Sequence, residues 1–177
     1  MHKKRSEKKY AIKHPQSGYA KHLIVKDFEL PSGVTEAFIL DRDKNSVQIF
    51  AITADKEIIT VLQFRPGSEK HELELPGGAM NVGEEPMAAA ARELLEETGH
   101  QGILQSMGAM HYSPYSTGQR HMFLATNCVK VAELNLDPNE FLTVKKIPLG
   151  HFLEIIKKGQ IRGTDLSYMA LDKLGML

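Results

Sequence analysis

Short apolar runs recur along this chain with turn residues between them, a pattern typical of β-strands. The strongest run is 58–64 (IITVLQF), which is β-branched and mostly apolar, so we expect a strand that is buried on both faces. Residues 25–40 predict a hairpin, because Pro31-Ser32-Gly33 is a turn signal between two runs rich in Val, Phe, Ile and Leu. Further strands are predicted at 47–53, 103–110, 122–125 and 141–147.

Three segments favour helices. The first begins near Pro86, which suits a first-turn position, and ends at Gly99, which suits a C-terminal cap. The second covers 148–158 and has cations in its last turn, and the third covers 165–174 with Asp165 as its expected N-cap. Strands, one helix, further strands and two final helices predict an α/β fold in which a mixed sheet is sandwiched between helices.

Composition narrows the function classes. The 22 basic residues balance 22 acidic ones in a chain of 177, and this balance argues against a general binder of nucleic acid or membrane surfaces. The single Cys128 excludes an intramolecular disulfide, suits a reducing compartment and is best explained as a small buried hydrophobe. No apolar run approaches the length of a membrane span, and the basic N-terminus lacks the apolar stretch of a signal peptide. We therefore expect a cytoplasmic protein.

The chain divides into three predicted parts. Residues 1–20 form a basic tail, with five cations among the first nine residues, which we expect to be disordered. Contact of this tail with RNA or a phosphate-rich partner is the alternative. Residues 21–44 contain the hairpin, and residues 45–177 form the main domain.

The most informative segment is 78–100 (GAMNVGEEPMAAAARELLEETGH). Helical spacing brings Glu93, Glu96 and Glu97 to one face, and we expect the opposite side to be buried by Met87, Ala88, Ala90, Ala91, Leu94 and Leu95. Between positions 72 and 97 seven acids face one base, Arg92, which is spaced to brace only Glu96. This face is either a solvated acidic surface or a cation site. Carboxylate ligands without His or Cys favour Mg²⁺ or Mn²⁺ over Zn²⁺.

The same segment resembles the signature of the Nudix hydrolases, in which a glycine, a glutamate and an Arg-Glu-aliphatic-x-Glu-Glu-x-Gly run stand at fixed spacings. The matching positions are Gly78, Glu84, Arg92, Glu93, Leu94, Glu96, Glu97 and Gly99. Only the final aliphatic position departs from the pattern, because it is His100. The resemblance implies the Nudix fold over 45–177, with the hairpin as an N-terminal extension. In the ADP-ribose pyrophosphatase branch such an extension commonly helps to build a two-fold dimer, so we expect a homodimer.

The resemblance also implies a catalytic and metal site. The metal ligands for Mg²⁺ or Mn²⁺ would be Glu93, Glu96, Glu97 and the carbonyl of Gly77. The catalytic residues would be Arg92 and a general base, either Glu96 or Glu140. Glu140 resembles the mobile-loop glutamate of ADP-ribose pyrophosphatases, and otherwise it is a solvated loop acid. Gln119 stands where these relatives often have a glutamate, so a base role at 119 is excluded.

Four residues are candidates for substrate binding: Arg65, Gly78, Pro114 and Phe28. Arg65 ends a strand near the acids, where it either clamps an anionic substrate or forms a salt bridge with a glutamate. Glycine at 78 lets the backbone approach a ligand. Pro114 belongs to the loop 111–120, which either holds a sugar or base or is a plain exposed loop. A proline at this distance beyond the signature marks relatives that act on ADP-ribose.

The predicted function is metal-dependent hydrolysis of the pyrophosphate bond of a nucleoside diphosphate linked to another group. ADP-ribose is the first choice, with AMP and ribose 5-phosphate as products. Other nucleotide sugars, such as GDP-mannose, and modified nucleotides are alternatives within this enzyme class. A non-catalytic nucleotide sensor is the alternative from another class, although the intact acid cluster argues against it. A third alternative is an RNA-processing hydrolase that uses the basic tail.

Overall fold

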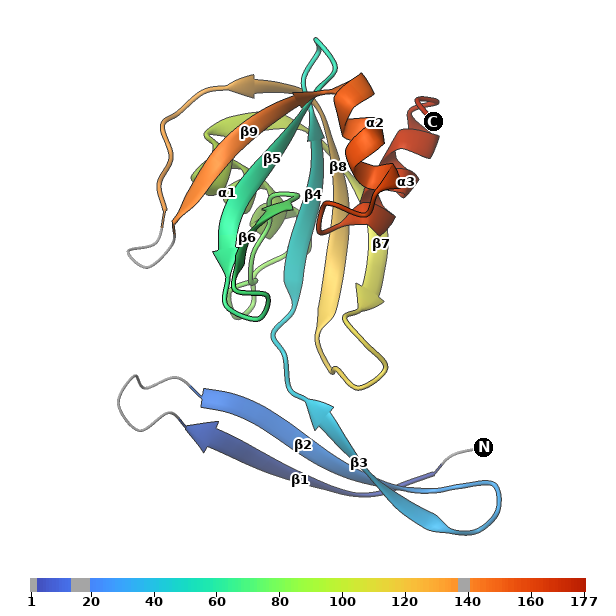
Figure 1. Cartoon of the computed structure of the whole chain (residues 1–177). Coiled ribbons are helices and arrows are strands. Elements are labelled where there is room, and N and C mark those ends of the chain that lie inside the picture. The colour runs from blue at the N-terminus through green and yellow to red at the C-terminus, as the bar shows by residue number, and fades with distance from the viewer. Residues whose placement is uncertain (1–2, 14–19, 137–140) are drawn as a thin grey trace. The chain divides into compact units, whose positions relative to one another are not determined.

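The computed structural model describes residues 3–13, 20–136 and 141–177. The chain forms two compact units (Figure 1). The larger unit comprises residues 46–109 and 121–177, and the smaller comprises the residues before 46 together with 110–120. In the described part of the chain, no helix is long and apolar enough to cross a membrane.

A six-stranded sheet forms the larger unit, in the order β6-β5-β4-β8-β7 with β9 also paired to β5. The strands are β4 (Ser46–Ile52), β5 (Glu57–Arg65), β6 (Lys70–Glu74), β7 (His100–His111), β8 (Gln119–Lys130) and β9 (Leu142–Pro148). β5 is antiparallel to β4, β6 and β9. Because β4 and β8 run in the same direction in Figure 1, the sheet is mixed, as the sequence predicted.

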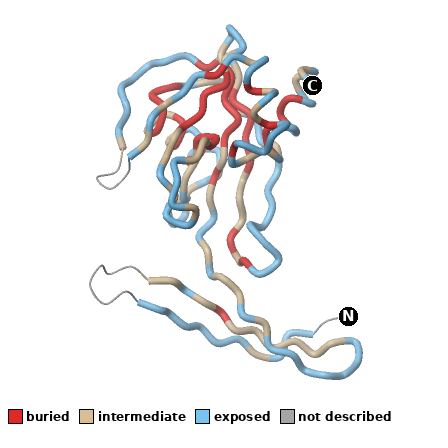
Figure 2. Tube along the Cα trace, in the orientation of Figure 1, coloured by how far each residue is buried: buried red, intermediate tan, exposed pale blue. Residues whose placement is uncertain are grey.

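Helices cover both faces of this sheet. The helices are α1 (Pro86–Thr98), α2 (Leu149–Lys157) and α3 (Thr164–Lys173). β4 supplies both halves of the core, because alternate residues point to opposite faces. Val47, Ile49 and Ala51 pack with α1, whereas Phe50 packs with α2 and meets Phe152 edge to face at 5.7 Å between ring centroids. The predicted α/β class is confirmed, and Figure 2 shows that burial concentrates in these strands.

Two local expectations in the larger unit need correction. The strand β5 is buried on both faces only over Ile58–Val61, and Phe64 near its end is 48 % exposed. Ile58 packs with residues of α2 and Ile59 with residues of α1, whereas Phe64 belongs to neither buried cluster. The N-cap of α3 is Gly163, so Asp165 lies inside the first turn instead of capping the helix.

The smaller unit is a three-stranded antiparallel sheet in the order β1-β2-β3. The strands β2 (Ala20–Glu29) and β3 (Thr35–Asp41) form the predicted hairpin, and Gly33 in its turn has a φ of 82°. The segment 110–120 joins this unit through hydrogen bonds to Asp41, whose N–H donates to the Tyr115 carbonyl at 2.7 Å.

The N-terminal strand β1 (Lys3–Lys13) corrects the expectation of a disordered tail. Its backbone pairs with β2 along nearly its whole length, with a bulge between Lys4 and Ser6. Two of its cations form ion pairs, Arg5 with Glu29 and Lys4 with Glu7, and the Ser6 hydroxyl donates a hydrogen bond to Asp27. A basic stretch that looks solvated in the sequence therefore forms an edge strand here.

Candidate metal and active site

The site in the larger unit begins with a glycine turn held against the edge of β4. The Val47 N–H donates to the Gly78 carbonyl at 2.9 Å, and the Ile49 N–H donates to the Pro76 carbonyl at 2.8 Å. Gly77 has a φ of 150°, and a Cβ there would lie 2.2 Å from the Val47 carbonyl oxygen. Only glycine fits at 77, so the sequence Pro76-Gly77-Gly78 fixes how this turn lies against the sheet.

The helix α1 begins at Pro86 and ends at Gly99, as predicted. Gly99 has a φ of 70°, and its N–H donates to the Leu95 carbonyl at 2.8 Å. The expected buried face is partly wrong, because Met87, Ala88 and Ala91 are exposed. The residues that α1 buries are Ala89, Ala90, Glu93, Leu94, Glu97 and Thr98. Two of the acids therefore point toward the sheet and the glycine turn.

The buried acids are fixed by the glycine turn. The Gly77 N–H donates to Glu97 Oε2 at 2.8 Å, and the Glu97 residue is only 3 % exposed. Gly78 leaves room for Glu93, since a Cβ at 78 would lie 2.6 Å from the carboxylate atoms of Glu93. The structure thus brings together three of the predicted ligand residues and the predicted substrate-binding Gly78. Substrate contact at Gly78 and metal binding by the Gly77 carbonyl stay predictions.

Arg92 is the cation of the cluster, and it contacts more acids than helical spacing suggested. Its Nη1 donates to Glu93 Oε1 at 2.8 Å and to Glu96 Oε2 at 2.9 Å. Its Nε and Nη2 donate to the two carboxylate oxygens of Glu84 at 2.8 and 2.9 Å. The expectation that Arg92 braces only Glu96 is wrong, because Glu84 reaches it from the loop before the helix.

This arrangement shifts the acid–base properties of its members. The Arg92 guanidinium and the Asn81 N–H hold the pKa of Glu84 down to about 2. The same ion pair with Glu84, followed by those with Glu96 and Glu93, raises the pKa of Arg92 above its usual value. Both groups therefore stay charged at neutral pH, and the bidentate geometry makes the pair a strong one.

The donor atoms fit a hard divalent cation. Glu93, Glu96 and Glu97 offer only oxygen, which suits Mg²⁺ or Mn²⁺. A cationic group, Arg92 Nη1, already lies between the carboxylates of Glu93 and Glu96. Among the described residues no three acidic, histidine or cysteine side chains are grouped as a preformed metal site. The Glu96 side chain is 35 % exposed, so it is the most accessible of these carboxylates from solvent.

Arg65 forms the salt bridge that was one of its two expected roles. Its Nε and Nη2 donate to the two carboxylate oxygens of Glu74 at 2.5 Å each. The Glu74 side chain is 8 % exposed, and its contact raises the pKa of Arg65. Arg162 lies on the other side, 3.6 Å from Glu74 Oε1 and in an ion pair with Glu72. Substrate binding by Arg65 stays a prediction.

Phe28 and Pro114 line one pocket of about 600 Å³ in the smaller unit. The other lining residues are Lys26, Phe38, Leu40 and Tyr115. Phe28 and Phe38 pack edge to face with ring centroids 5.8 Å apart. The structure therefore brings together two candidates that lie far apart in the sequence, in a pocket with aromatic walls and one lysine.

Three remaining predictions have different outcomes. Glu140 lies outside the described residues, so its role as a base stays a prediction. Gln119 donates its backbone N–H to Asn45 Oδ1 at 3.0 Å. Cys128 is buried, and burial raises the pKa of its thiol to about 11, which agrees with an inert hydrophobic role.

Comparison with known proteins decides the family. A model of the NUDIX domain matches residues 43–164, more than half of the chain. The chain belongs to the Nudix family. It is 33 % identical over 165 residues to an ADP-ribose pyrophosphatase of Bacillus subtilis (strain 168), covering 92 % of this chain and 89 % of that protein. It is also 33 % identical to a methanol dehydrogenase activator of Bacillus methanolicus, covering 82 % of this chain and 80 % of that protein.

A solved structure supports the Nudix fold. The crystal structure of an ADP compounds hydrolase superposes with a TM-score of 0.74 at 22 % identity, covering 96 % of this chain and 95 % of that one. The family match and the 33 %-identical relative identify the protein as a Nudix pyrophosphatase, and members of this family generally use a divalent metal.

The structure gives two acids, Glu84 and Glu74, ion-pair contacts that the sequence did not predict. Glu84 was seen only as a signature position, although its spacing before Arg92 was the available signal. Glu74 had no such signal, since its pairing with Arg65 follows from the antiparallel register of β5 and β6.

The contact between Gly78 and Glu93 generates the first prediction. In Gly78→Ala the new Cβ pushes the Glu93 carboxylate away from its place beside Arg92. We expect hydrolysis to fall by about 10- to 100-fold with the fold retained, because small displacements of catalytic groups cost this much. Steady-state kinetics and circular dichroism measure the two effects. The control is Gly67→Ala, where a Cβ meets nothing within 4 Å. Equal activity of the two variants would contradict the prediction.

The ion pair of Glu84 generates a prediction about pH. Its folded-state pKa of about 2 lies below the usual value, so the pair stabilises the fold above about pH 4.3 and loses this contribution as the pH falls toward 2. In Glu84→Gln this contribution is absent. We expect the wild type to exceed the variant in free energy of unfolding at about pH 6, and the gap to shrink at about pH 3. Urea titrations of both proteins at both pH values measure this difference in the free energy of unfolding.

The control for this experiment is Glu85→Gln, since the Glu85 side chain makes no capping hydrogen bond to α1. The prediction fails if the difference in free energy of unfolding between wild type and Glu84→Gln is the same at both pH values. The Arg92 contact would then not act through the charge of Glu84.

Proposed function

We propose that this Nudix pyrophosphatase hydrolyses ADP-ribose to AMP and ribose 5-phosphate. The observation that carries the proposal is the similarity to the Bacillus subtilis ADP-ribose pyrophosphatase, which extends over 92 % of this chain. An ADP-ribose pyrophosphatase of Saccharomyces cerevisiae, 31 % identical over 62 % of this chain, supports it further. The aromatic pocket of the smaller unit, with Phe28 and Pro114 in its lining, suits the flat base of a nucleotide.

The proposed metal ligands are Glu93, Glu96, Glu97 and the Gly77 carbonyl. A bound divalent ion would neutralise the anionic pyrophosphate and acidify a water molecule. The protein's own part begins with the Gly77 N–H, which holds the Glu97 carboxylate in place. Arg92 orients Glu93 and Glu96 through its two bonds from Nη1. These contacts order the acids before substrate arrives.

The water that attacks phosphorus needs a base for its proton. We propose Glu96 or Glu140 for this role. Glu96 is supported by the exposure of its side chain and by its single contact with Arg92, which leaves one carboxylate oxygen free of that bond. Arg65 is proposed to bind the substrate's anionic groups with the donor atoms that Glu74 does not occupy.

A substrate panel with a ligand variant tests this function. We expect Mg²⁺-dependent release of AMP from ADP-ribose, with slower turnover of GDP-mannose, dinucleoside polyphosphates and oxidised nucleotides. Glu97→Gln should lower kcat by roughly 100-fold or more and leave the fold intact, because it removes one charged oxygen ligand. The matched control is Glu154→Gln on the exposed surface of α2, which should keep full activity. Near-wild-type turnover by Glu97→Gln would overturn the metal assignment.

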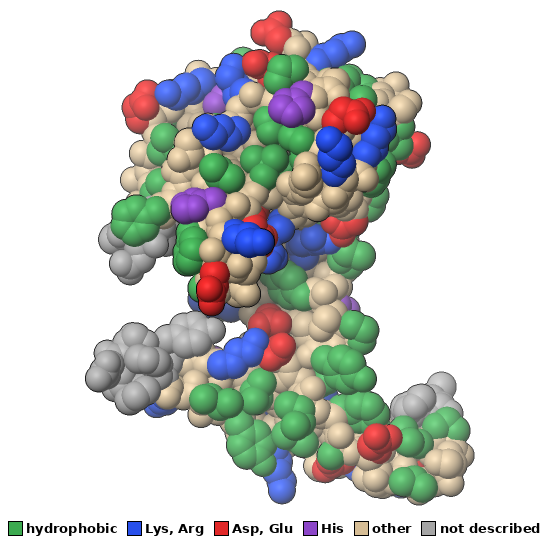
Figure 3. All heavy atoms as spheres, viewed as in Figure 1, with side chains coloured by type: hydrophobic (Ala, Val, Ile, Leu, Met, Phe, Trp, Pro, Cys, Tyr) green, Lys and Arg blue, Asp and Glu red, His purple; other side chains and the backbone are tan. Residues whose placement is uncertain are grey.

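We also propose that the protein is a homodimer that associates through the N-terminal sheet. Cross-strand pairing places Tyr10, Leu23, Val25 and Ile39 on one face of this sheet, where Tyr10 is 52 % and Ile39 is 63 % exposed. Figure 3 shows hydrophobic side chains gathered on the exposed surface of this unit. An exposed apolar face of this kind is typical of an interaction surface.

The dimer proposal predicts the effect of a charge on this face. Ile39→Lys should convert the protein to a monomer, measured by light scattering coupled to gel filtration, because burying the new ammonium group is costly. Val34→Lys is the control, since Val34 is equally exposed but lies in the hairpin turn. A monomeric wild type, or a dimer that tolerates Ile39→Lys, would refute association through this face.

A further inference from the structure

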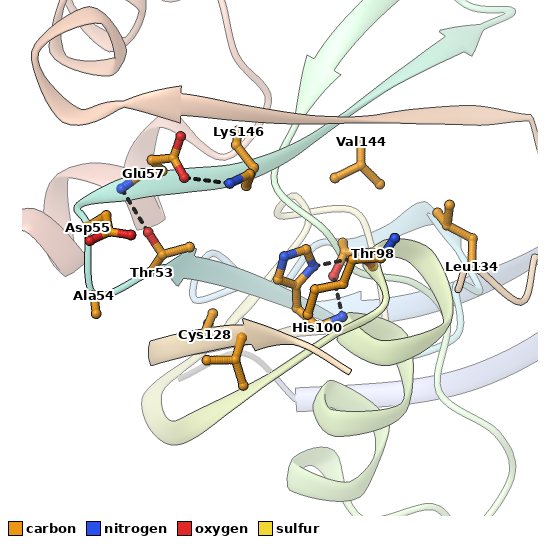
Figure 4. A pocket seen from close by; sticks show the side chains of 12 residues that line it. Thr53, Ala54, Asp55, Glu57, Thr98, His100, Cys128, Leu134, Val144 and Lys146 are labelled. Atoms are coloured by element: carbon orange, nitrogen blue, oxygen red, sulfur yellow. Dashed lines mark hydrogen bonds and ion pairs between the residues drawn. The ribbon is translucent and has the colours of Figure 1, made fainter. Parts of the chain in front are cut away.

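A second pocket of the larger unit takes no part in the proposed hydrolysis. It has a volume of about 510 Å³, within the range typical of small-molecule sites. It lies at the C-terminal end of α1, between the β4–β5 turn and β9 (Figure 4). Its lining includes Thr53, Thr98, His100, Cys128, Leu134 and Val144.

His100 is the position at which this chain departs from the aliphatic residue of the Nudix signature. The residue is only 6 % exposed, and its Nδ1 lies 2.7 Å from the Thr98 carbonyl oxygen. A carbonyl only accepts hydrogen bonds, so Nδ1 carries the hydrogen, and in the neutral ring Nε2 is an acceptor. The Thr98 bond therefore fixes both the ring orientation and the tautomer.

Nε2 of His100 is directed into the pocket. No hydrogen bond joins it to any described residue. Every fully buried side-chain nitrogen or oxygen of the described residues has a partner, so Nε2 must be open to the pocket. In Figure 4 this nitrogen lies on the side of the ring away from Thr98. A polar atom in such a buried place is normally satisfied by water or a ligand.

The rest of the lining indicates what kind of ligand fits. Cys128, Leu134 and Val144 give apolar walls, and burial raises the pKa of the Cys128 thiol to about 11, so it stays neutral. The cations of the rim are already paired, Lys146 with Glu57 at 2.6 Å and Lys130 with Glu133 at 3.0 Å. Neither sign of charge is in excess, so the lining does not select a strong anion or cation.

One further polar group points to the same class of ligand. The Thr53 Oγ1 accepts a hydrogen bond from the Glu57 N–H at 3.1 Å, which leaves its own hydrogen available as a donor. Beside its two acidic and two basic side chains, which include Asp55, the pocket thus offers the Nε2 acceptor of His100, the Thr53 hydroxyl donor and apolar walls.

We propose that this pocket is a second, non-catalytic binding site for a compact, neutral, mostly apolar molecule that donates a hydroxyl or N–H hydrogen to Nε2 of His100. The site is separate from the acid cluster, and its occupancy does not depend on which substrate the enzyme hydrolyses.

Nuclear magnetic resonance titration of the full chain with phenol tests the proposal, with anisole as the matched probe that lacks the hydroxyl hydrogen. We expect phenol to shift the amide signals of Thr53, Cys128 and Val144 saturably and to change the Nε2 resonance of His100. Anisole should bind about 10-fold more weakly, because it leaves Nε2 without a partner. The absence of saturable shifts at these residues, or equal affinity for the two probes, would overturn the proposal.

Variants at two histidines make the test specific. His100→Leu restores the aliphatic residue of the signature and should weaken phenol binding about 10-fold while leaving anisole binding nearly unchanged. His151→Leu, at an exposed position on α2, should bind both probes as the wild type does. Unchanged phenol affinity in His100→Leu would contradict the role of Nε2. If His100→Leu does not fold, the relative affinities of the wild type for phenol and anisole test the role of Nε2.

Discussion

The charge balance at Arg92 is the constraint on which the rest of the site depends. Glu93 and Glu97 are almost fully buried, and a buried carboxylate without a partner is strongly destabilising. The guanidinium compensates Glu93 directly and ties Glu84 and Glu96 to the same point. Because arginine stays protonated at every working pH, the loop before α1 and the acidic face of the helix are held together as one piece.

The sheet supplies the other half of this constraint. Hydrogen bonds from β4 fix the glycine turn. This turn then fixes the Glu97 carboxylate through the Gly77 N–H. A side chain at Gly77 would collide with the β4 backbone, and one at Gly78 would collide with Glu93. The position of the acids is therefore set by the register of the turn on β4 as well as by the helix. This explains how a cluster of like charges keeps a defined geometry.

The features that depend on local residues could be predicted from the sequence. The bounds of α1 follow from Pro86 and Gly99, and the strands follow from their apolar runs. The buried face of α1 could not be predicted, because Glu93 and Glu97 are buried against partners from the glycine turn, distant in sequence. Ala91 is exposed, so no described element covers that side of the helix. The strand β1 was missed for a similar reason, since its backbone pairs with β2 and Arg5 finds its acidic partner, Glu29, across that pairing.

The central claim is that this acidic face of α1 is the metal site of the enzyme. The most direct measurement is an anomalous-scattering map from crystals grown with Mn²⁺. The account predicts manganese peaks beside the carboxylates of Glu93, Glu96 and Glu97. Peaks only at other positions, or none at a Mn²⁺ concentration that supports full hydrolysis, would contradict it.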